Sequence, residues 1–377
     1  MKLKDFVIIN PRESLPKGTV SKKVSMDKLK PYSRDIIEFE MESYSGGAKF
    51  RKGDILMARI TPCLENGKIS KADFLNEGEI GFGSTEFIVF RAIPGISDEN
   101  FLYYLICSDI IKVPAIKSMV GSSGRQRVQV DVLENLDIEV PCFDKQRRIG
   151  QLLKIFDDKI ELNNKINNNL EQQAQAIYQQ MFVDNPSSVW KEGTLSDIAD
   201  ITMGQSPSGS SYNEESIGTI FFQGRAEFGF RFPTVRLFTA EPKRMACAND
   251  TLVSVRAPVG DLNVAHTDCC IGRGLAAIHS KTNHQSFVLY TMFSLKKQLD
   301  VFNGEGTVFG SINRNSLNEM PIFIPSDEKI EEFEGIVAPM DTAIRNNYDE
   351  ICHLEQIRDS LLPKLMSGEL DVSDIEL

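Results

Sequence analysis

The feature that most constrains this chain is an internal repeat. Leu170-Glu171-Gln172 returns as Leu354-Glu355-Gln356, 184 residues later, and the same offset relates Asp157 to Asp341. A period of this length far exceeds the roughly 20–50 residues of solenoid repeats, so each copy must be a globular unit with its own core. The sequence therefore predicts two similar units that bind two similar ligands.

Each copy carries a long stretch in which apolar residues alternate at spacings of four and three, the pattern of a coiled-coil seam. The predicted seam positions are Ile149, Leu153, Phe156, Ile160, Asn163, Leu170 and Ile177 in the first copy, and Phe333, Val337, Met340, Ile344, Asn347, Leu354 and Leu361 in the second. We expect the two helices to pack on each other, with Asn163 and Asn347 fixing their register. The alternative is that each amphipathic helix lies on its own domain.

About 140 residues with a different pattern precede each helix. Short apolar runs such as 55–58, 87–90, 220–222 and 251–255 are separated by glycine and proline, which is typical of strands and turns. We therefore predict an α+β chain with two pseudo-repeated, mixed and strand-rich domains and two long helices. The expected boundaries are 1–144 for the first domain, 145–183 for the first helix, 184–326 for the second domain, and 327–377 for the second helix and tail.

The net charge of −11 argues against nucleic acid only until its distribution is considered. Residues 327–377 hold 14 acidic and 4 basic residues, so nearly all of the acidic excess lies there and the two domains are close to neutral. Phosphate contacts depend on local clusters of basic residues, which the domains can still form. No apolar run approaches the roughly 18 residues that span a bilayer, and the seven cysteines lack metal-site spacing. We expect a cytoplasmic chain without a metal.

Three segments carry a family resemblance. They are the closing stretch LEQIRDSLLPKLMSGEL at 354–370, the proline-to-helix junction from Pro141 to Ile149, and the opening of the second domain at 190–207. Together they resemble the DNA-specificity subunit of type I restriction-modification enzymes. The chain departs from that pattern at Lys145, where glutamate is usual, and at Met1, where the first domain starts without a tryptophan.

The resemblance implies two target-recognition domains, each reading one half of a bipartite double-stranded DNA sequence, joined by an antiparallel pair of helices. It also implies partners: two DNA adenine methyltransferase subunits and restriction or translocase subunits. S-adenosylmethionine is expected on the methyltransferase, and this chain is expected to bind no cofactor. The duplicated organisation inferred from the residues agrees with this pattern, because antiparallel tandem copies are related by a pseudo-twofold axis.

Catalytic motifs are missing from the sequence. It contains no GxxxxGK[ST] phosphate loop, no GxGxxG turn and no Asn- or Asp-Pro-Pro-Tyr segment. Asp54, Glu65 and Lys68 have the wrong spacing for a metal-dependent nuclease, and we interpret them as an exposed loop. We predict a non-catalytic DNA-recognition subunit. The alternatives are a coiled-coil adaptor that joins proteins without reading DNA, and an enzyme with an unrecognised nuclease site.

Candidate DNA contacts lie in loops broken by glycine, where backbone can approach phosphates and side chains can reach base edges. In the first domain they are Tyr44, Lys49, Arg51, Arg59, Lys68, Ser122, Arg125 and Arg127. In the second domain they are Gln223, Arg225, Arg231, Arg256, Arg273, Ser311, Asn313 and Arg314. For any single arginine, a solvated surface charge is the competing interpretation. As a set at corresponding places in both domains, these residues favour DNA.

Overall fold

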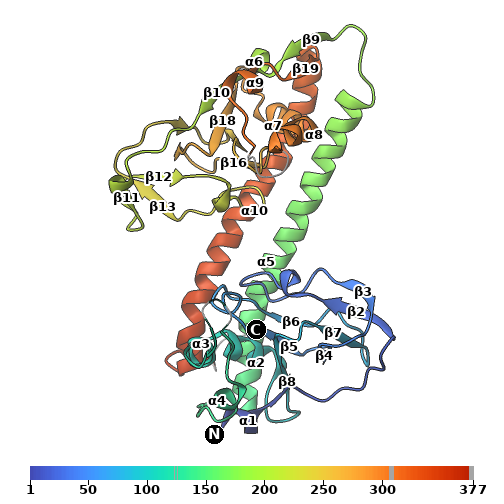
Figure 1. The fold of residues 1–377 in the computed structure, drawn as a ribbon, viewed down its shortest axis with the longest axis vertical. Helices are drawn as coiled ribbons and strands as arrows, with labels where there is room; N and C mark the ends of the chain where they lie inside the picture. Colours follow the sequence, from blue (N-terminus) through green and yellow to red (C-terminus); the bar gives the residue numbers. More distant parts are fainter. Residues whose placement is uncertain (123, 125, 305–309, 373–377) are drawn as a thin grey trace. The chain divides into compact units, whose positions relative to one another are not determined.

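The computed structural model describes residues 1–122, 124, 126–304 and 310–372. The chain divides into two compact units, which we call unit 1 (Met1–Leu162 with Glu350–Leu377) and unit 2 (Asn163–Asp349). The long helices α5 (Phe143–Tyr178) and α10 (Asp327–Ser367) each contribute one part to each unit (Figure 1). No helix within the described ranges is long and apolar enough to cross a membrane.

Besides its parts of the long helices, unit 1 contains a lobe built from two four-stranded sheets with short helices. Its strands are β1 (Val7–Ile9), β2 (Val20–Val24), β3 (Glu40–Ser43), β4 (Ala48–Arg51), β5 (Ile55–Ala58), β6 (Ile69–Lys71), β7 (Ile80–Gly83) and β8 (Phe87–Ala92). Its helices are α1 (Leu3–Phe6), α2 (Glu99–Cys107), α3 (Asp109–Lys117) and α4 (Val130–Glu134), with a 3-10 turn η1 (Met26–Lys28). The strand orders are β1-β8-β5-β6 and β3-β2-β7-β4.

The lobe of unit 2 repeats this plan. Its strands are β9 (Lys191–Thr194), β10 (Ala199–Met203), β11 (Tyr212–Asn213), β12 (Thr219–Phe222), β13 (Leu237–Thr239), β14 (Met245–Ala246), β15 (Thr251–Ser254), β16 (Leu262–Val264), β17 (Cys269–Ile271), β18 (Leu275–Ser280) and β19 (Pro321–Ile324). Its helices are α6 (Leu195–Ile198), α7 (Gln285–Ser294), α8 (Lys296–Asp300) and α9 (Arg314–Asn318), with a π-helical turn η2 (Gln179–Val183) and 3-10 turns η3 (Gly209–Ser211), η4 (Arg225–Glu227) and η5 (Val301–Asn303).

The repeat predicted from the sequence is confirmed by the strand topology. Sheet β10-β18-β15-β16 has the order of β1-β8-β5-β6, and β13-β12-β17-β14 has the order of β3-β2-β7-β4. In the second kind of sheet the central pair is parallel in both units, β2 with β7 and β12 with β17. Unit 2 adds β11 at one edge and a two-stranded sheet of β19 with β9. The predicted α+β class is therefore confirmed, with the duplication visible strand by strand.

Strand β5 explains why these strands appear in the sequence as continuous apolar runs. Ile55 and Met57 belong to the core that includes helix α2, whereas Leu56 belongs to the core beneath the second sheet. A strand covered on both faces has no polar side, so its residues do not alternate between apolar and polar. Strand β15 repeats this arrangement, with Val253 in one core and Leu252 in the other.

Helices α5 and α10 pack against each other and against the lobe within each unit. In unit 1, Asp157 accepts a hydrogen bond from Arg358 Nη1 (2.6 Å) and Lys159 pairs with Glu350 (3.2 Å), so the pair is antiparallel. In unit 2, Asn347 Nδ2 donates to Asn167 Oδ1 (2.8 Å). The helices therefore pack on each other and also lie on the lobe of each unit, as the two interpretations of the seam had it separately. Within each unit, residues of the helices and of the lobe share one hydrophobic core.

The predicted seam residues divide between the two units. Buried in unit 1 are Ile149, Leu153 and Ile160, with Phe156, Leu354 and Leu361 half-buried. Buried in unit 2 are Asn163, Phe333, Val337 and Ile344, with Leu170, Ile177, Met340 and Asn347 half-buried. Asn347, one of the two predicted register residues, makes its hydrogen bond to Asn167, which follows the buried Asn163 on the same face of α5.

Candidate nucleic-acid interface

Two loops of the first lobe are joined by backbone hydrogen bonds. The loop after β5 (59–62) lies beside the segment before α4 (126–128), because Thr61 N donates to Gln126 O (3.1 Å) and Val128 N donates to Arg59 O (2.9 Å). Arg59 N also donates to Glu86 O (2.8 Å), which brings the start of β8 to the same place. We call this site the paired-loop surface of lobe 1.

The second lobe has the same construction. Ala257 N donates to Gly310 O (3.0 Å), Ile312 N donates to Val255 O (3.0 Å), and Val255 N donates to Gly274 O (2.9 Å). A cis peptide occurs at the same place in both lobes, Thr61-Pro62 and Ala257-Pro258. Segments 255–258, 310–312 and the residues before β18 therefore form the paired-loop surface of lobe 2.

These shared hydrogen bonds align the two surfaces residue by residue. Ile60 forms a bridge with Arg127, and Arg256 forms the equivalent bridge with Ser311. The position that Arg127 occupies in lobe 1 is thus held by Ser311 in lobe 2. Glu86, which accepts from Arg59 N, corresponds to Gly274, which accepts from Val255 N. The acidic side chain of lobe 1 has no counterpart in lobe 2.

The cations on the surface of lobe 1 are engaged by neighbouring groups. Arg127 donates from Nε to both carboxylate oxygens of Glu86 (3.0 and 2.9 Å) and from Nη2 to Oε1 (2.5 Å). The hydrogen bonds from Arg127 lower the pKa of the Glu86 carboxyl. Arg59 Nε donates to Val128 O (3.1 Å), and Ser122 is exposed nearby in sequence. Arg125 lies outside the described residues.

The cations on the surface of lobe 2 are largely free. Arg256, Arg273 and Arg314 are exposed, and none of their side chains has an ion-pair partner among the described residues. Asn313 caps helix α9 by accepting from Ser316 N (2.9 Å), and both Asn313 and Ser311 are exposed. Gln223 is also exposed, and Arg225 pairs with Asp261.

A second group of predicted residues in lobe 1 gathers around Glu13 and not at the paired-loop surface. Lys49 Nζ donates to Glu13 O (2.6 Å) and lies 5.3 Å from the centre of the Tyr44 ring. Arg51 Nη2 pairs with the Glu13 carboxylate (2.6 Å). Lys68 is separate from this group, since its ammonium donates to Met26 O (2.8 Å).

Arg231 has a different environment from the other predicted DNA contacts. Its side chain is only 4% exposed, and it pairs with Glu171 of α5 (3.0 Å) and Asp341 of α10 (3.1 Å). Its Nη2 also donates to Tyr290 Oη (3.1 Å). A cation covered in this way joins the lobe to both helices and has no access to a base edge. Nothing in the sequence around Arg231 separates it from the exposed arginines nearby.

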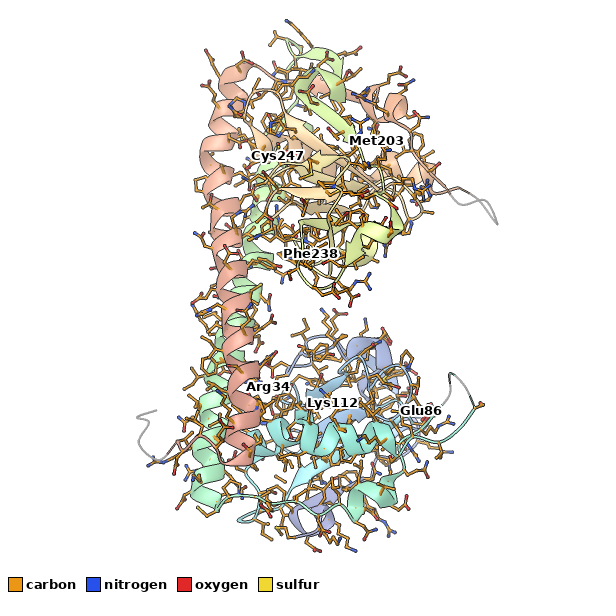
Figure 2. All side chains as sticks on the ribbon, turned by 90° about the vertical axis from the view of Figure 1, so that its left-hand side faces the viewer. Arg34, Glu86, Lys112, Met203, Phe238 and Cys247 are labelled. Carbon is orange, nitrogen blue, oxygen red and sulfur yellow. The ribbon has the colours of Figure 1, made fainter. Side chains whose placement is uncertain are left out.

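Lobe 1 contains the equivalent of Arg231, which the sequence did not reveal. Lys71 N donates to Arg34 O (2.6 Å) as Val264 N donates to Arg231 O (2.8 Å), which aligns the two arginines. Arg34 is 7% exposed and its Nη2 pairs with Asp158 of α5 (2.7 Å), beside the helices in Figure 2. Burial opposes the charge, but Asp35 and Asp158 outweigh it and raise the pKa of Arg34.

A tyrosine and an aspartate complete this junction in both units. Tyr104 Oη donates to Asp157 (2.6 Å), and Tyr290 Oη donates to Asp341 (2.9 Å). Burial raises the pKa of both tyrosines, so both hydroxyls remain protonated donors. The 184-residue repeat could have identified the two aspartates, because they are related by that offset. The arginines are not, since the loops before them differ in length.

Two equivalent lobes, each with a loop surface that carries arginines and each docked on paired helices, define a duplicated nucleic-acid-reading protein. The model of the type I restriction modification DNA specificity domain matches residues 1–172 and 187–347. The chain therefore belongs to the family of type I restriction-modification specificity proteins, and the resemblance stated from the sequence is confirmed.

Relatives and solved structures agree with this assignment. The chain is 29% identical to the MjaX type I restriction enzyme specificity subunit of Methanocaldococcus jannaschii, over 93% of this chain and 85% of the relative. It is 23% identical to the HindI specificity subunit of Haemophilus influenzae, over 85% and 87% of the two chains. The type I S subunit of M. genitalium has the same fold, with a TM-score of 0.62 at 16% identity over 97% of this chain and 95% of that one.

The chain is thus a DNA-recognition subunit without catalytic activity of its own. It carries two copies of the specificity domain, and two copies are what the reading of a bipartite target requires. Its relatives are named as specificity subunits of type I restriction enzymes.

Proposed function

We propose that each lobe reads one half of the bipartite target with its paired-loop surface. The observation that carries this proposal is the repeated backbone pairing of 59–62 with 126–128 and of 255–258 with 310–312. The equivalent bridge contains one arginine in each lobe, Arg127 in the first and Arg256 in the second. Loops joined in this way hold side chains at fixed positions while leaving them exposed, as base reading requires.

The residues proposed to touch DNA divide by their surroundings. In lobe 1 they are Arg59, Ser122, Arg125 and Arg127, with Tyr44, Lys49, Arg51 and Lys68 as outer contacts. In lobe 2 they are Gln223, Arg225, Arg256, Arg273, Ser311, Asn313 and Arg314. We assign Arg231 to the junction with the helices, because its guanidinium is buried against Glu171 and Asp341.

The same proposal covers the partners and the domain boundaries. Residues 1–144 and 184–326 serve as target-recognition domains, and 145–183 with 327–377 serve as helices on which two DNA adenine methyltransferase subunits dock. Those subunits carry S-adenosylmethionine, restriction or translocase subunits join the larger complex, and this chain binds no cofactor. The family assignment supports a multi-subunit enzyme, and the exposed faces of α5 and α10 offer surface for partners.

The experiment is a gel shift with the full chain, alone and with its methyltransferase subunits, on double-stranded DNA carrying the target found by mapping methylated adenines. We expect weak binding by the chain alone, because the lobes are near neutral and the last segment is acidic. Sequence-specific binding should appear with the methyltransferase. A coiled-coil adaptor would show no sequence-specific binding in either case, and that outcome would overturn the proposal.

A further inference from the structure

The ion pair of Arg127 with Glu86 stands on the paired-loop surface of lobe 1. The side chains are 49% and 23% exposed, so the pair faces solvent and is open to a ligand. Figure 2 shows Glu86 on the part of lobe 1 away from the long helices of its own unit. Exposed pairs contribute little to stability. The pair is therefore not what holds lobe 1 together, and its place on the paired-loop surface leaves it available to a ligand.

Backbone contacts fix both partners. Arg127 exchanges hydrogen bonds with Val120 (N to O 2.9 Å and O to N 3.1 Å) and forms a bridge with Ile60. Glu86 accepts from Arg59 N through its carbonyl (2.8 Å) and donates its own N–H to Ser84 Oγ (3.1 Å). The two side chains thus start from anchored backbone.

The contacts occupy one edge of the guanidinium and leave the other edge open. Glu86 takes the Nε and Nη2 edge. An arginine has five N–H donors in a planar fork, so both Nη1 hydrogens and the second Nη2 hydrogen remain unused by this pair. Two of these point in parallel from the Nη1 and Nη2 edge. This is the arrangement that matches O6 and N7 of guanine in the major groove.

We propose that Glu86 is a positioning residue that presents Arg127 to a guanine, so that this pair determines the identity of one G·C base pair in the half-site of lobe 1. The inference rests on the proposed function of the paired-loop surface. A phosphate contact would need only a flexible cation and would gain nothing from an adjacent carboxylate, which repels phosphate oxygens. Lobe 2 has Gly274 and Ser311 at these places and must read its half-site by other contacts.

The test uses the full chain in complex with its methyltransferase subunits and a set of duplexes in which each base pair of both half-sites is replaced in turn. Methylation rates are compared for wild type, Arg127→Ala, Glu86→Ala and Glu86→Gln. Asp137→Ala serves as a matched control, because Asp137 is an exposed carboxylate of lobe 1 that pairs with Lys2 (2.7 Å) elsewhere on the lobe. Thermal unfolding verifies that each variant is folded.

We expect Arg127→Ala to lose about tenfold to hundredfold discrimination at a single G·C pair. Glu86→Ala should relax discrimination at the same base pair to a smaller degree. A further variant that combines Arg127→Ala with Glu86→Ala should be no worse than Arg127→Ala alone, since the two residues act as a unit. Glu86→Gln keeps the size of the side chain but removes the charge, so it should also relax discrimination at that base pair. It takes the place of Glu86→Ala in the test if Glu86→Ala fails to fold. Asp137→Ala should change no position.

Other outcomes would overturn the inference. If Glu86→Ala strengthens binding to all sequences and steepens the salt dependence, then Arg127 is a phosphate contact that Glu86 partly neutralises. If base discrimination is unchanged in all variants, then Arg127 and Glu86 do not determine a base pair, and the inference is also overturned. In both cases a wild-type complex that still discriminates its bipartite target leaves the proposed function standing. A wild-type complex that methylates without discrimination would show instead that the proposed function had failed.

Discussion

The two lobes share one scaffold but differ in how they hold their arginines. On the paired-loop surface of lobe 1, Arg127 is bound by Glu86 and Arg59 by a carbonyl. On the surface of lobe 2, Arg256, Arg273 and Arg314 have no ion-pair partner among the described residues. Duplication has thus kept the backbone hydrogen bonds and changed the side chains. We expect the held Arg127 to read a base, and the unpaired cations of lobe 2 to include phosphate contacts, which position the protein without reading sequence.

At the junctions with the helices, by contrast, the two units use the same device. A buried arginine and a tyrosine from the lobe reach carboxylates on the long helices in both. The junctions have diverged less than the surfaces: Arg231 pairs with carboxylates of both helices, whereas Arg34 pairs with Asp158 of α5. This is the pattern expected when the junction keeps each lobe attached and the loops choose the target.

The largest expected effect concerns the buried arginines. Replacing Arg231 with alanine leaves the largely covered carboxylates of Glu171 and Asp341 (16% and 21% exposed) without their cation, so the free energy of unfolding of unit 2 should fall by about 3–5 kcal/mol. Arg34→Ala should cost unit 1 somewhat less, about 2–3 kcal/mol, because Asp35 is covered (18% exposed) but Asp158 is 45% exposed and water can solvate it. Urea unfolding followed by the fluorescence of Trp190, the single tryptophan, reports on unit 2.

Arg231→Ala also tests the assignment of this residue to the junction. The variant should keep its preference at every base position under conditions where it stays folded. If the variant has normal stability but loses discrimination at a base pair of the lobe 2 half-site, then Arg231 contacts DNA and is not equivalent in role to Arg34.

The paired tyrosines give the next effect. Tyr290→Phe removes a hydrogen bond to Asp341 and one from Arg231, and Tyr104→Phe removes one to Asp157. Hydrogen bonds to charged groups contribute about 1.5–3 kcal/mol each, so both variants should be less stable and Tyr290→Phe should lose more. Hydrogen exchange of α2 and α7 measures each junction separately. Equal protection in wild type and variants would show that these bonds do not hold the lobes.

The fold was largely predictable from the sequence, for physical reasons. The seam of α5 and α10 is periodic, and the repeat offset preserves Asp157 and Asp341. The alignment of Arg34 with Arg231, and of Glu86 with Gly274, was not predictable because loops of different length shift these residues off that offset. Glu86 was also missed since a carboxylate does not resemble a DNA contact until its arginine is seen beside it.

The free cations of lobe 2 should produce a smaller and more uniform effect. Arg314→Ala should weaken binding of the complex to all duplexes alike and reduce the slope of log K against log salt by about one. The slope follows from phosphate contact, which carries no sequence information. Binding isotherms at several salt concentrations measure it. Loss of binding confined to duplexes changed at one base pair would show that Arg314 reads a base. The expected difference between the arginines of the two lobes would then be wrong.

The smallest expected effect is the pH dependence of the Glu86 pair. Arg127 lowers the pKa of Glu86 in the folded state, so the stabilisation is present above the unfolded pKa of about 4.3 and is lost as the pH falls through the lower folded value. The urea midpoints of wild type and Glu86→Gln should differ slightly at pH 7 and converge in acid. Base discrimination by the wild-type complex should not change between pH 6 and 8. A change within that range attributable to Glu86 would contradict the pairing.

The two paired-loop surfaces should serve different half-sites. Methylated adenines should be mapped across a randomised target library for Arg127→Ala and for the double variant Arg256→Ala with Arg314→Ala, each in complex with the methyltransferase subunits. Arg127→Ala should relax one half-site only, and the double variant should leave that half-site unchanged. Relaxation of the same half-site by both variants, or of both half-sites by Arg127→Ala, would contradict it.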